Sequence, residues 1–444
     1  MKTQFVAFAL LLLTLAACTG IDSSSFEKDS FKQPSYNVSL SEISRIDFSK
    51  MVSPQTKTAG ALSKEITPIV EGKDTLLYII NYGKDEGWVL ASADKRTPLI
   101  VATSENGSFN LKTVSENKGL SIWLDNVKAD VDYLKRHPDY FPDSTQSQQI
   151  TLDFPQTKGG EEHEGEWRQL VYTMIDIVPR YETDHLMSTH WGQYEPWNIS
   201  VPLNGNGGRC PTGNATTAIA QLAYYLHYKI GKPVNTYAYA ECYDDWDDYN
   251  NNSSLIVFHN NSPHRWNYMD LDSANTTSLG QAAVAALMAN VAKQTGISFY
   301  PDSTSTPSMT AIQSYLTSES INSFNIPFNN VFVYNSIKNG YPVPVQLTSG
   351  QDTCYAVIDG VKEYYYYYTY YYQWMPMGTY PPVEPEYPDL NHPELYEIGY
   401  GWGDLASVSY KLNWGEYGNY DDGWFYQSNA WRNYTQSQIL YGFQ

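Results

Sequence analysis

The side chains most able to do chemistry in this sequence are cysteines in apolar surroundings. Cys210 opens the stretch CPTGNATTAIAQLAYYLHY, in which a turn at Gly213 is followed by Asn214 and a run of small and apolar residues. The start of a helix favours a negatively charged thiolate, because the helix dipole is positive there. Here the residue after the turn is a carboxamide, which cannot ionise to a nucleophile. The stretch predicts a buried helix that starts within one residue of Asn214 and lacks a reactive group.

Cys354 lies in the strand-like run TCYAVIDGV. A thiol titrates near pH 8.5 and is a poor general base at neutral pH. A free cysteine on an apolar strand is most often buried and unreactive. Cys210, Cys242 and Cys354 allow one disulfide with one thiol left over, and the sequence does not choose the pair. No CxxC pair or cluster of histidines and cysteines indicates a metal site, and no cofactor is expected.

The net charge excludes several classes of partner. The chain has 444 residues and a formal net charge of −20. This charge opposes binding to nucleic acid, which depends on cationic contacts to phosphate. It also disfavours docking on anionic lipid through a basic patch. The length allows two or three domains, and the 42% hydrophobic content is enough for a large core.

The N-terminus has the anatomy of a bacterial export signal. Lys2 is followed by an apolar run from Phe5 to Ala17, which is shorter than the ~20 residues of a membrane-spanning helix. The letters LAAC at 15–18 resemble a lipobox, in which the signal peptide is removed and lipid is attached to Cys18. An ordinary cleavable signal is the alternative. We expect a signal peptide at 1–17 and a lipid anchor on Cys18, at the outer membrane or surface of a Gram-negative cell.

Two folded regions are expected after a polar tether at 18–60. Residues 61–137 indicate a small α+β domain, with strands at 75–82, 87–94 and 98–104 and a helix at 120–136. The polar, acidic segment 138–166 is expected to be a linker. The region 167–444 has helical patterns from 215, at 279–297 and at 308–318, then strand-like runs at 330–335, 342–348, 354–361, 407–415 and 423–429. Helices followed by an antiparallel sheet indicate an α+β fold.

Six segments of the large region resemble, in one order, the streptopain family of secreted bacterial cysteine peptidases. They are WGQYEPWN (191–198), CPTGNATTAIAQLAYYLHY (210–228), RWNYMDLD (265–272), LMANVAKQTGISFYPDSTS (287–305), YAVIDGV (355–361) and LNWGEYGNYDDGWF (412–425). The run GWVLASADKRTPLIVATSENGSF at 87–109 resembles the family's propeptide, which occludes the active site before maturation. The resemblance implies a papain-like cysteine peptidase fold with zymogen architecture, in which the domain at 61–137 is the propeptide or inhibitor-like part.

The resemblance also assigns the site residues one by one. The family's nucleophilic cysteine falls on Asn214 and its catalytic histidine falls on Cys354, so both reactive groups are replaced. Gln193 matches the glutamine near the oxyanion, and Asn413 and Trp414 match the residues near the histidine. Loss of a nucleophile alone costs several orders of magnitude in rate. We therefore expect a chain that keeps the frame of a peptidase and no longer cleaves.

Two rewired sites are the alternatives to an inactive one. Cys210 is a candidate for a displaced nucleophile, although family members carry a CP pair there as well as the reactive cysteine. Cys354 is a candidate for a nucleophile on the opposite wall, with His190 or His392 as its base. A working site must be held to about half an ångström, and nothing in the sequence positions these pairs.

A tyrosine-rich insertion at 361–408 stands where the family has a short turn. Its pattern predicts an extended β-hairpin with a proline-rich tip at 376–388, overhanging the former cleft. Tyrosine and tryptophan are also enriched at recognition surfaces, because they offer large area with a polar tip. The candidate binding residues are Tyr364, Tyr366, Tyr368, Tyr370, Tyr372 and Trp374.

Three functions remain open on this basis. The first is an envelope lipoprotein that does not cleave and that binds a protein, peptide or glycan through the old cleft and the insertion. The second is an active cysteine endopeptidase with a rewired site. The third is a protease inhibitor that acts through the domain at 61–137. An inactive member cannot release its own propeptide, so the two parts are expected to stay linked; the oligomeric state is left open.

Overall fold

The computed structural model describes residues 36–46, 48–52, 63–140, 166–229, 237–238, 262–319, 321–376, 397–418, 420, 423–426 and 434–439. The chain from Asn37 onward forms one unit by its internal contacts. Within the described ranges, no helix combines the length and the apolar character needed to cross a membrane. The signal peptide expected at 1–17 and the lipidation site Cys18 lie outside these ranges.

The N-terminal domain is a four-stranded antiparallel sheet with a long helix packed on it. Its elements are β1 (Lys64–Glu71), β2 (Asp74–Tyr82), β3 (Trp88–Ser92), β4 (Ile100–Ser104), α3 (Leu111–Glu116) and α4 (Lys118–Arg136). The three predicted strands and the predicted helix are confirmed, each within about two residues of its expected ends. Strand β1 was not predicted, because most of its side chains are exposed and its apolar pattern is weak.

The expected tether at 18–60 is wrong for residues 37–52, which belong to this domain. They form α1 (Leu40–Arg45) and α2 (Ser49–Val52), and α1 begins with a capping box between Ser39 and Glu42. Ile43, Phe48 and Val52 are buried in a core cluster with residues of β2 and β3. The polar composition of the segment hid these few apolar anchors.

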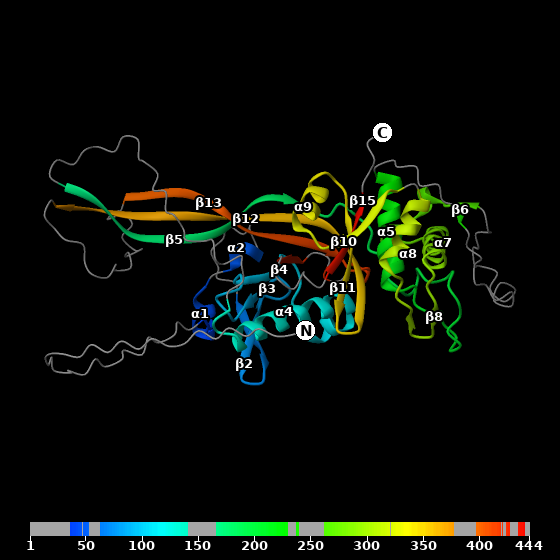
Figure 1. The fold of residues 1–444 in the computed structure, drawn as a ribbon, viewed down its shortest axis with the longest axis horizontal. Coiled ribbons are helices and arrows are strands. Elements are labelled where there is room, and N and C mark those ends of the chain that lie inside the picture. Colours follow the sequence, from blue (N-terminus) through cyan, green and yellow to red (C-terminus); the bar gives the residue numbers. More distant parts are fainter. Residues whose placement is uncertain are drawn as a thin grey trace, which may run out of the picture. The chain divides into compact units, whose positions relative to one another are not determined.

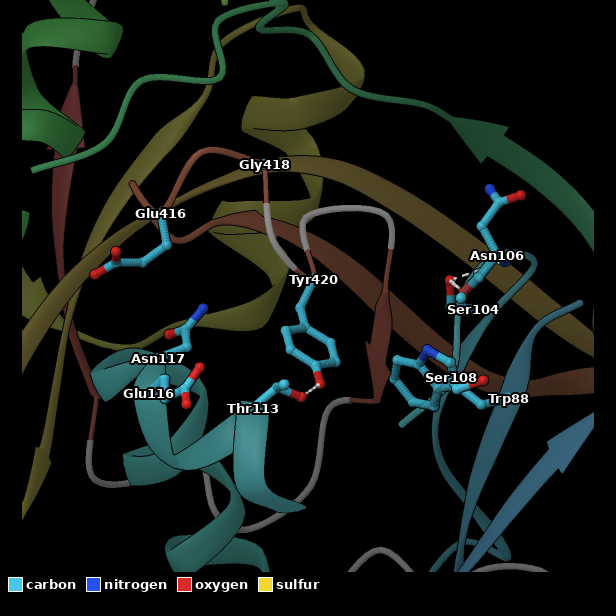
Figure 2. A pocket seen from close by; sticks show the side chains of 11 residues that line it. Trp88, Ser104, Asn106, Ser108, Thr113, Glu116, Asn117, Glu416, Gly418 and Tyr420 are labelled. Atoms are coloured by element: carbon cyan, nitrogen blue, oxygen red, sulfur yellow. Dashed lines mark hydrogen bonds between the residues drawn. The ribbon is translucent and has the colours of Figure 1, made fainter. Parts of the chain in front are cut away.

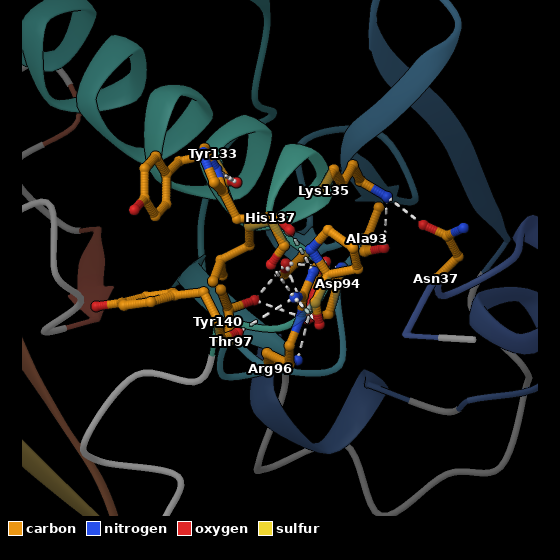
Figure 3. Close-up of polar contacts among 12 residues, drawn as sticks. Asn37, Ala93, Asp94, Arg96, Thr97, Tyr133, Lys135, His137 and Tyr140 are labelled. Carbon is orange, nitrogen blue, oxygen red and sulfur yellow. Dashed lines mark hydrogen bonds and ion pairs between the residues drawn. The ribbon is translucent and has the colours of Figure 1, made fainter. Parts of the chain in front are cut away.

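A buried arginine holds the end of α4 (Figure 3). Arg96 forms a two-pronged ion pair with the Asp94 carboxylate, at 3.0 Å from Nε and 2.7 Å from Nη2. The last carbonyls of a helix lack partners within the helix, and Arg96 donates to that of Leu134 in the last turn of α4. It also donates to the carbonyls of His137, Pro138 and Tyr140, which follow the helix. The chain is therefore fixed as far as Tyr140, and most of the linker expected at 138–166 lies outside the described residues.

The C-terminal region begins with helices and continues with strands, as predicted. The described helices are α5 (Asn214–Tyr224), a π-helix η2 (Tyr225–Lys229), a 3-10 turn η3 (Trp266–Tyr268), α7 (Ser278–Gln294), α8 (Met309–Ser318) and α9 (Asn330–Lys338). Two small hairpins are formed by β6 (Tyr237–Ala238) with β7 (Ser262–Pro263), and by β8 (Phe299–Tyr300) with β9 (Ser303–Thr304). Helices α5, α7 and α8 share one hydrophobic core.

One of the predicted strands is a helix. The run at 330–335 was expected to be a strand, but it forms the first part of α9. Asn329 caps this helix, since its Oδ1 accepts a hydrogen bond from the Phe332 amide at 3.0 Å. Val333 and Ile337, one turn apart, are fully buried, whereas Val331 is 70% exposed. Burial at a spacing of four residues selects the helix over the strand.

The two domains share one antiparallel sheet. Its order is β1-β2-β3-β4-β14-β13-β12-β11-β15-β10, and β5 pairs with β12 off this path. The remaining strands are β5 (Glu166–Thr183), β10 (Ser323–Pro327), β11 (Val343–Ser349), β12 (Asp352–Pro376), β13 (Glu397–Asn413), β14 (Trp424–Tyr426) and β15 (Tyr434–Ile439). The junction is the pairing of β14 with β4, in which Phe425 lies opposite Ala102.

The tyrosine-rich insertion forms the predicted hairpin and gains a third strand. β12 and β13 pair along their length, with Tyr364 opposite Ser407 and Tyr372 opposite Glu397. Strand β5, which follows the linker in the chain, pairs with the other edge of β12 (Figure 1). Of the expected hairpin tip at 376–388, Pro376 ends β12 and residues 377–388 lie outside the described residues. The third strand was not predicted, because pairing between residues 178 to 210 positions apart leaves no local signal.

Candidate active site

Asn214 is the first residue of α5, as its sequence context predicts. The residue before it, Gly213, has a φ of +85°, a conformation that glycine adopts without strain. The Asn214 side chain does not cap its own helix. Instead, its Nδ2 donates a hydrogen bond to the Sγ atom of Cys354. The two positions at which the family resemblance places a nucleophile and a base are therefore in direct contact.

Cys354 is buried and held as a neutral thiol. Cys354 is 1% exposed. Loss of solvation raises the pKa of this thiol to about 12, and the nearby negative charge of Glu416 adds to the rise. At neutral pH almost none of it is thiolate, which is the reactive form of cysteine. The hydrogen bond from Asn214 therefore reaches a sulfur that is neither a nucleophile nor a general base.

Gln193 lies beside α5, but a carboxylate engages its side chain. The Gln193 carbonyl accepts a hydrogen bond from the Thr212 amide at 2.8 Å, which fixes the residue against the loop that enters α5. Its Nε2 donates to Glu416. Burial raises the pKa of Glu416 to about 7, while the bond from Gln193 opposes this rise. The side-chain amide of Gln193, which is expected near the oxyanion, is therefore hydrogen-bonded to Glu416 instead.

Asn413 and Trp414 hold neighbouring elements together in this structure, and neither forms a hydrogen bond with Cys354. Asn413 is 3% exposed and exchanges two hydrogen bonds with Gln221 of α5, at 2.8 and 3.2 Å. Its Nδ2 also donates to the carbonyl of Thr189 at 2.9 Å. These bonds tie the end of β13 to α5. Trp414 is 1% exposed and lies in the core cluster that contains Cys354.

The start of α4 covers this site from the N-terminal domain. A Cβ atom built on Gly119 would lie 2.5 Å from Cε3 of Trp414 and 3.0 Å from Sγ of Cys354. Only a residue without a side chain allows this approach. Residues of α4 and of β12 accordingly belong to one core cluster. The N-terminal domain thus closes the region around Cys354, as the resemblance to a zymogen implies.

Neither rewired site gains support from the described contacts. Cys210 is 3% exposed, and among the described residues its thiol donates one hydrogen bond, to the Leu203 carbonyl at 3.8 Å. Burial raises the pKa of this thiol as well. His190 forms no described hydrogen bond to either thiol, and His392 lies outside the described residues. Both described cysteines are free thiols, so they do not form the disulfide that the sequence left open.

Three of the six residues proposed for binding are buried in the described structure. Tyr364, Tyr370 and Tyr372 are 7%, 3% and 8% exposed. The side chains of Tyr366, Tyr368 and Trp374 lie outside the described residues. Along β12 and β13 the best-exposed described ring is Tyr400, at 59%, which stacks on Tyr367 with 6.0 Å between ring centres. The three buried rings are packed within the hairpin, and their role in binding stays a prediction.

The arrangement includes three residues that the sequence reasoning missed. These are Glu416, Gly119 and Asn117, the cap of α4. Glu416 stands in a matched segment, two residues after Trp414, yet nothing in its type or spacing indicates the contact with Gln193. The two others come from a different domain. Contacts of this kind depend on the packed fold and leave no signature in a linear motif.

Comparison with known proteins agrees with the two-domain fold. A model of the Peptidase C10 family matches residues 191–425, and a model described as Spi protease inhibitor matches residues 42–131. The thiol protease/hemagglutinin PrtT of Porphyromonas gingivalis is 24% identical over 176 residues. This match covers 39% of the present chain and only 18% of PrtT.

The solved structure of a prointerpain A fragment from Prevotella intermedia shows the same fold. It has a TM-score of 0.51 at 16% sequence identity, and the match covers 86% of this chain and 100% of the fragment. The fold is therefore the α+β, papain-like fold of a cysteine peptidase, preceded by a propeptide-like domain. The Peptidase C10 match takes in more than half of the residues, and this chain accordingly belongs to that streptopain-like peptidase family.

Proposed function

We propose that this chain is a non-cleaving member of its family, held at the cell envelope by a lipid anchor, and that it binds a protein, peptide or glycan. The contact between Asn214 and Cys354 carries the proposal. Peptide hydrolysis by this fold needs a thiolate and an imidazole. Here an amide donates to a buried thiol whose pKa is about 12, so neither group can attack a carbonyl or move a proton at neutral pH.

The contact between Gln193 and Glu416 supports the same conclusion, because it affects stabilisation of the oxyanion. An oxyanion is stabilised by donors that point at the place where its charge develops. The Gln193 amide is bonded to a carboxyl group instead. When ionised, this carboxyl group repels a developing oxyanion. Removal of one such donor costs about 10²–10³ in kcat, on top of the loss of the nucleophile.

A peptidyl epoxide tests the proposal, because it alkylates an activated cysteine and leaves an inert one unmodified. The reduced, full-length chain is incubated with the epoxide at pH 7 and examined by intact mass spectrometry. We expect no adduct. An adduct that disappears in Cys354→Ala and persists in Cys210→Ala would establish a site rewired around Cys354. The reverse pattern would establish Cys210 as the nucleophile.

Inhibition of another peptidase is the second candidate function. It is favoured by the Spi inhibitor match at 42–131 and by the position of Gly119 over Cys354 and Trp414. The test adds the full-length chain, intact or cut in the segment 141–165, to an active Peptidase C10 enzyme and measures casein hydrolysis. Inhibition by the cut chain supports this role. Full activity of the enzyme with both forms excludes it.

The ligand is sought with arrays of peptides and glycans, using the chain without residues 1–18. A saturable signal on one class, lost after heat denaturation of the chain, identifies the kind of ligand. Absence of any specific signal on both arrays counts against a role in peptide or glycan binding and leaves a folded protein partner, which capture by the same chain would reveal.

A further inference from the structure

A cavity of about 500 Å³ lies between the N-terminal domain and the loop that follows β13 (Figure 2). The N-terminal domain contributes the ends of β3 and β4 and the corner between α3 and α4. The other domain contributes Glu416, Gly418 and Tyr420. Pockets of this size hold small ligands or a few residues of a peptide. The cavity is not the covered thiol site, since Cys354 does not line it.

One wall of the cavity carries a buried donor without a partner. Asn117 is 4% exposed, and its Oδ1 caps α4 by accepting from the Leu120 amide at 3.0 Å. Its Nδ2 has no hydrogen bond among the described residues. An unsatisfied buried donor costs about 1–3 kcal/mol. Figure 2 shows this amide between Glu416 and Tyr420, at the space they surround. A ligand with an oxygen acceptor would satisfy it.

The charged groups that line the cavity are carboxylates. Glu116 is exposed, and no ion pair with it is found among the described residues. Glu416 uses Oε1 for the bond from Gln193, which leaves Oε2 for a ligand. The lining contains no lysine or arginine. The positive end of the α4 dipole, worth about half a charge, does not outweigh Glu116 together with Glu416 once the Glu416 carboxyl group, whose pKa is raised to about 7, is ionised. The cavity therefore favours a cation over an anion.

Trp88, one of the two aromatic residues of the lining, does not offer an open face for stacking a sugar. Trp88 is 2% exposed and packs on Phe109, with 4.7 Å between ring centres. Tyr420 lies edge-on to the same phenylalanine at 5.9 Å, and its hydroxyl is bonded to Thr113. Beside the half-buried Tyr420 ring, the described lining therefore offers charge and hydrogen bonding for recognition.

We propose that the cavity binds a protonated primary amine with a neighbouring carbonyl oxygen, as the amino terminus of a peptide presents them. The ammonium group lies between Glu116 and Glu416, and the carbonyl oxygen accepts from Nδ2 of Asn117. This site does not depend on whether the chain cleaves peptide bonds. It involves neither Asn214 nor Cys354, so its failure would leave the proposed function untouched.

The test measures binding of triglycine amide to the full chain by calorimetry at about pH 7.5, where most of the Glu416 carboxyl group is ionised and most of the peptide's α-amine is still protonated. N-acetyl-triglycine amide lacks the cation, ethylamine lacks the carbonyl, and glucosamine presents an amine on a sugar. We expect triglycine amide to bind at least tenfold more tightly than the other three. Glu116→Gln and Glu416→Gln should each weaken its binding about fivefold, whereas Glu71→Gln, an exposed carboxylate on β1, should leave it unchanged.

Asn117→Asp tests the contribution of the Asn117 amide donor apart from that of the carboxylates Glu116 and Glu416. Aspartate keeps the capping oxygen of α4 but removes the amide donor. The preference for triglycine amide over ethylamine should therefore fall toward one. Equal binding of the acetylated peptide would overturn the proposal, as would an unchanged preference in Asn117→Asp. Binding of glucosamine without triglycine amide would assign the same carboxylates to an amino sugar and overturn the peptide assignment. No binding of any of the four compounds at millimolar concentration would also overturn it.

Discussion

The contact between Asn214 and Cys354 replaces an ionised pair with a neutral one. A thiolate and an imidazolium need solvent or compensating charges, because burial of an isolated ion is very costly. An amide and a thiol do not carry that cost, and the site can be covered completely. The same logic applies to Glu416: burial raises the pKa of its carboxyl group to about 7, because the neutral form is less costly to bury than the ion. The chemistry of the site and its burial are thus linked.

Glu319 offers a test of electrostatics in the folded core. It is 2% exposed, its Oε2 has no described hydrogen bond, and burial raises its pKa from 4.5 to about 7. A raised carboxyl pKa stabilises the fold below pH 4.5, and this stabilisation is lost as the pH rises through 7. Each pKa unit corresponds to about 1.4 kcal/mol, so the loss is roughly 3 kcal/mol by pH 8.

The prediction is that Glu319→Gln removes this part of the pH dependence. Urea unfolding of the variant at pH 8 should give a free energy of unfolding that is higher than that of the wild type, with little difference at pH 4.5. Glu65→Gln, at an exposed position of β1, serves as the control and should follow the wild-type curve. A Glu319→Gln variant with the same pH profile as the wild type would show that this carboxyl group is ionised without penalty.

Helix α4 is the element that closes the site, and its close approach depends on Gly119. Replacement of a helical glycine by alanine normally stabilises a helix by about 1 kcal/mol. Here the added Cβ would lie 2.5 Å from a Trp414 ring carbon, and overpacking of this kind costs about 1–3 kcal/mol. We expect Gly119→Ala to destabilise the full chain in urea unfolding, against the propensity trend.

A second substitution on the same helix provides the reference for that experiment. Ala129 is exposed on α4, so Ala129→Gly reports helix propensity alone and should cost about 1 kcal/mol. If Gly119→Ala were more stable than the wild type by the same amount, α4 would not press on Trp414, and the account of a covered site would fail.

The elements differ in how far the sequence predicts them. Strands β2, β3 and β4 and helix α4 have a clear apolar period and turn residues at their ends, so they were predicted. The run at Asn330–Lys338 has apolar residues at the spacing of a strand and at the spacing of a helix. Only the burial of Val333 and Ile337 favours the helix. Strand β5 is specified by its partner β12, which no local pattern reveals.

The residues of the site also differ in how far the sequence predicts them. Asn214, Cys354 and Gln193 follow from the register of short motifs, because the fold of the family places those positions together. The roles of Glu416, Gly119 and Asn117 follow from contacts across the two domains. Such contacts depend on how α4 and the loop after β13 meet.

At the scale of the whole molecule, the N-terminal domain is joined to the rest by more than its linker. β4 pairs with β14 in the common sheet, and α4 shares a core with β11 and β12. We therefore predict that a protease cut within 141–165 leaves both fragments together in size-exclusion chromatography without denaturant. Separation of the fragments under these conditions would mean that the domain is held only by the connecting chain.

A lipid anchor is a second prediction at the scale of the whole molecule. The LAAC segment predicts that Cys18 carries lipid. Cells fed an alkyne-tagged palmitate should label the full-length chain, and the chain should fractionate with membranes. Cys18→Ser should abolish both. A Cys18→Ser chain that is exported and membrane-bound to the same extent would show that the segment is not a lipidation signal.

The central claim is that the replaced pair, Asn214 and Cys354, has ended peptide hydrolysis. The most direct measurement is hydrolysis of fluorescently labelled casein under reducing conditions, by the wild-type chain and by Gly119→Ala, in which α4 is loosened over the site. Both are assayed intact and after a cut in the linker, alongside Cys354→Ala and Cys210→Ala. We predict rates equal to the buffer background for every sample. Thiol-dependent hydrolysis by the wild type or by Gly119→Ala, lost on removal of either cysteine, would contradict the account.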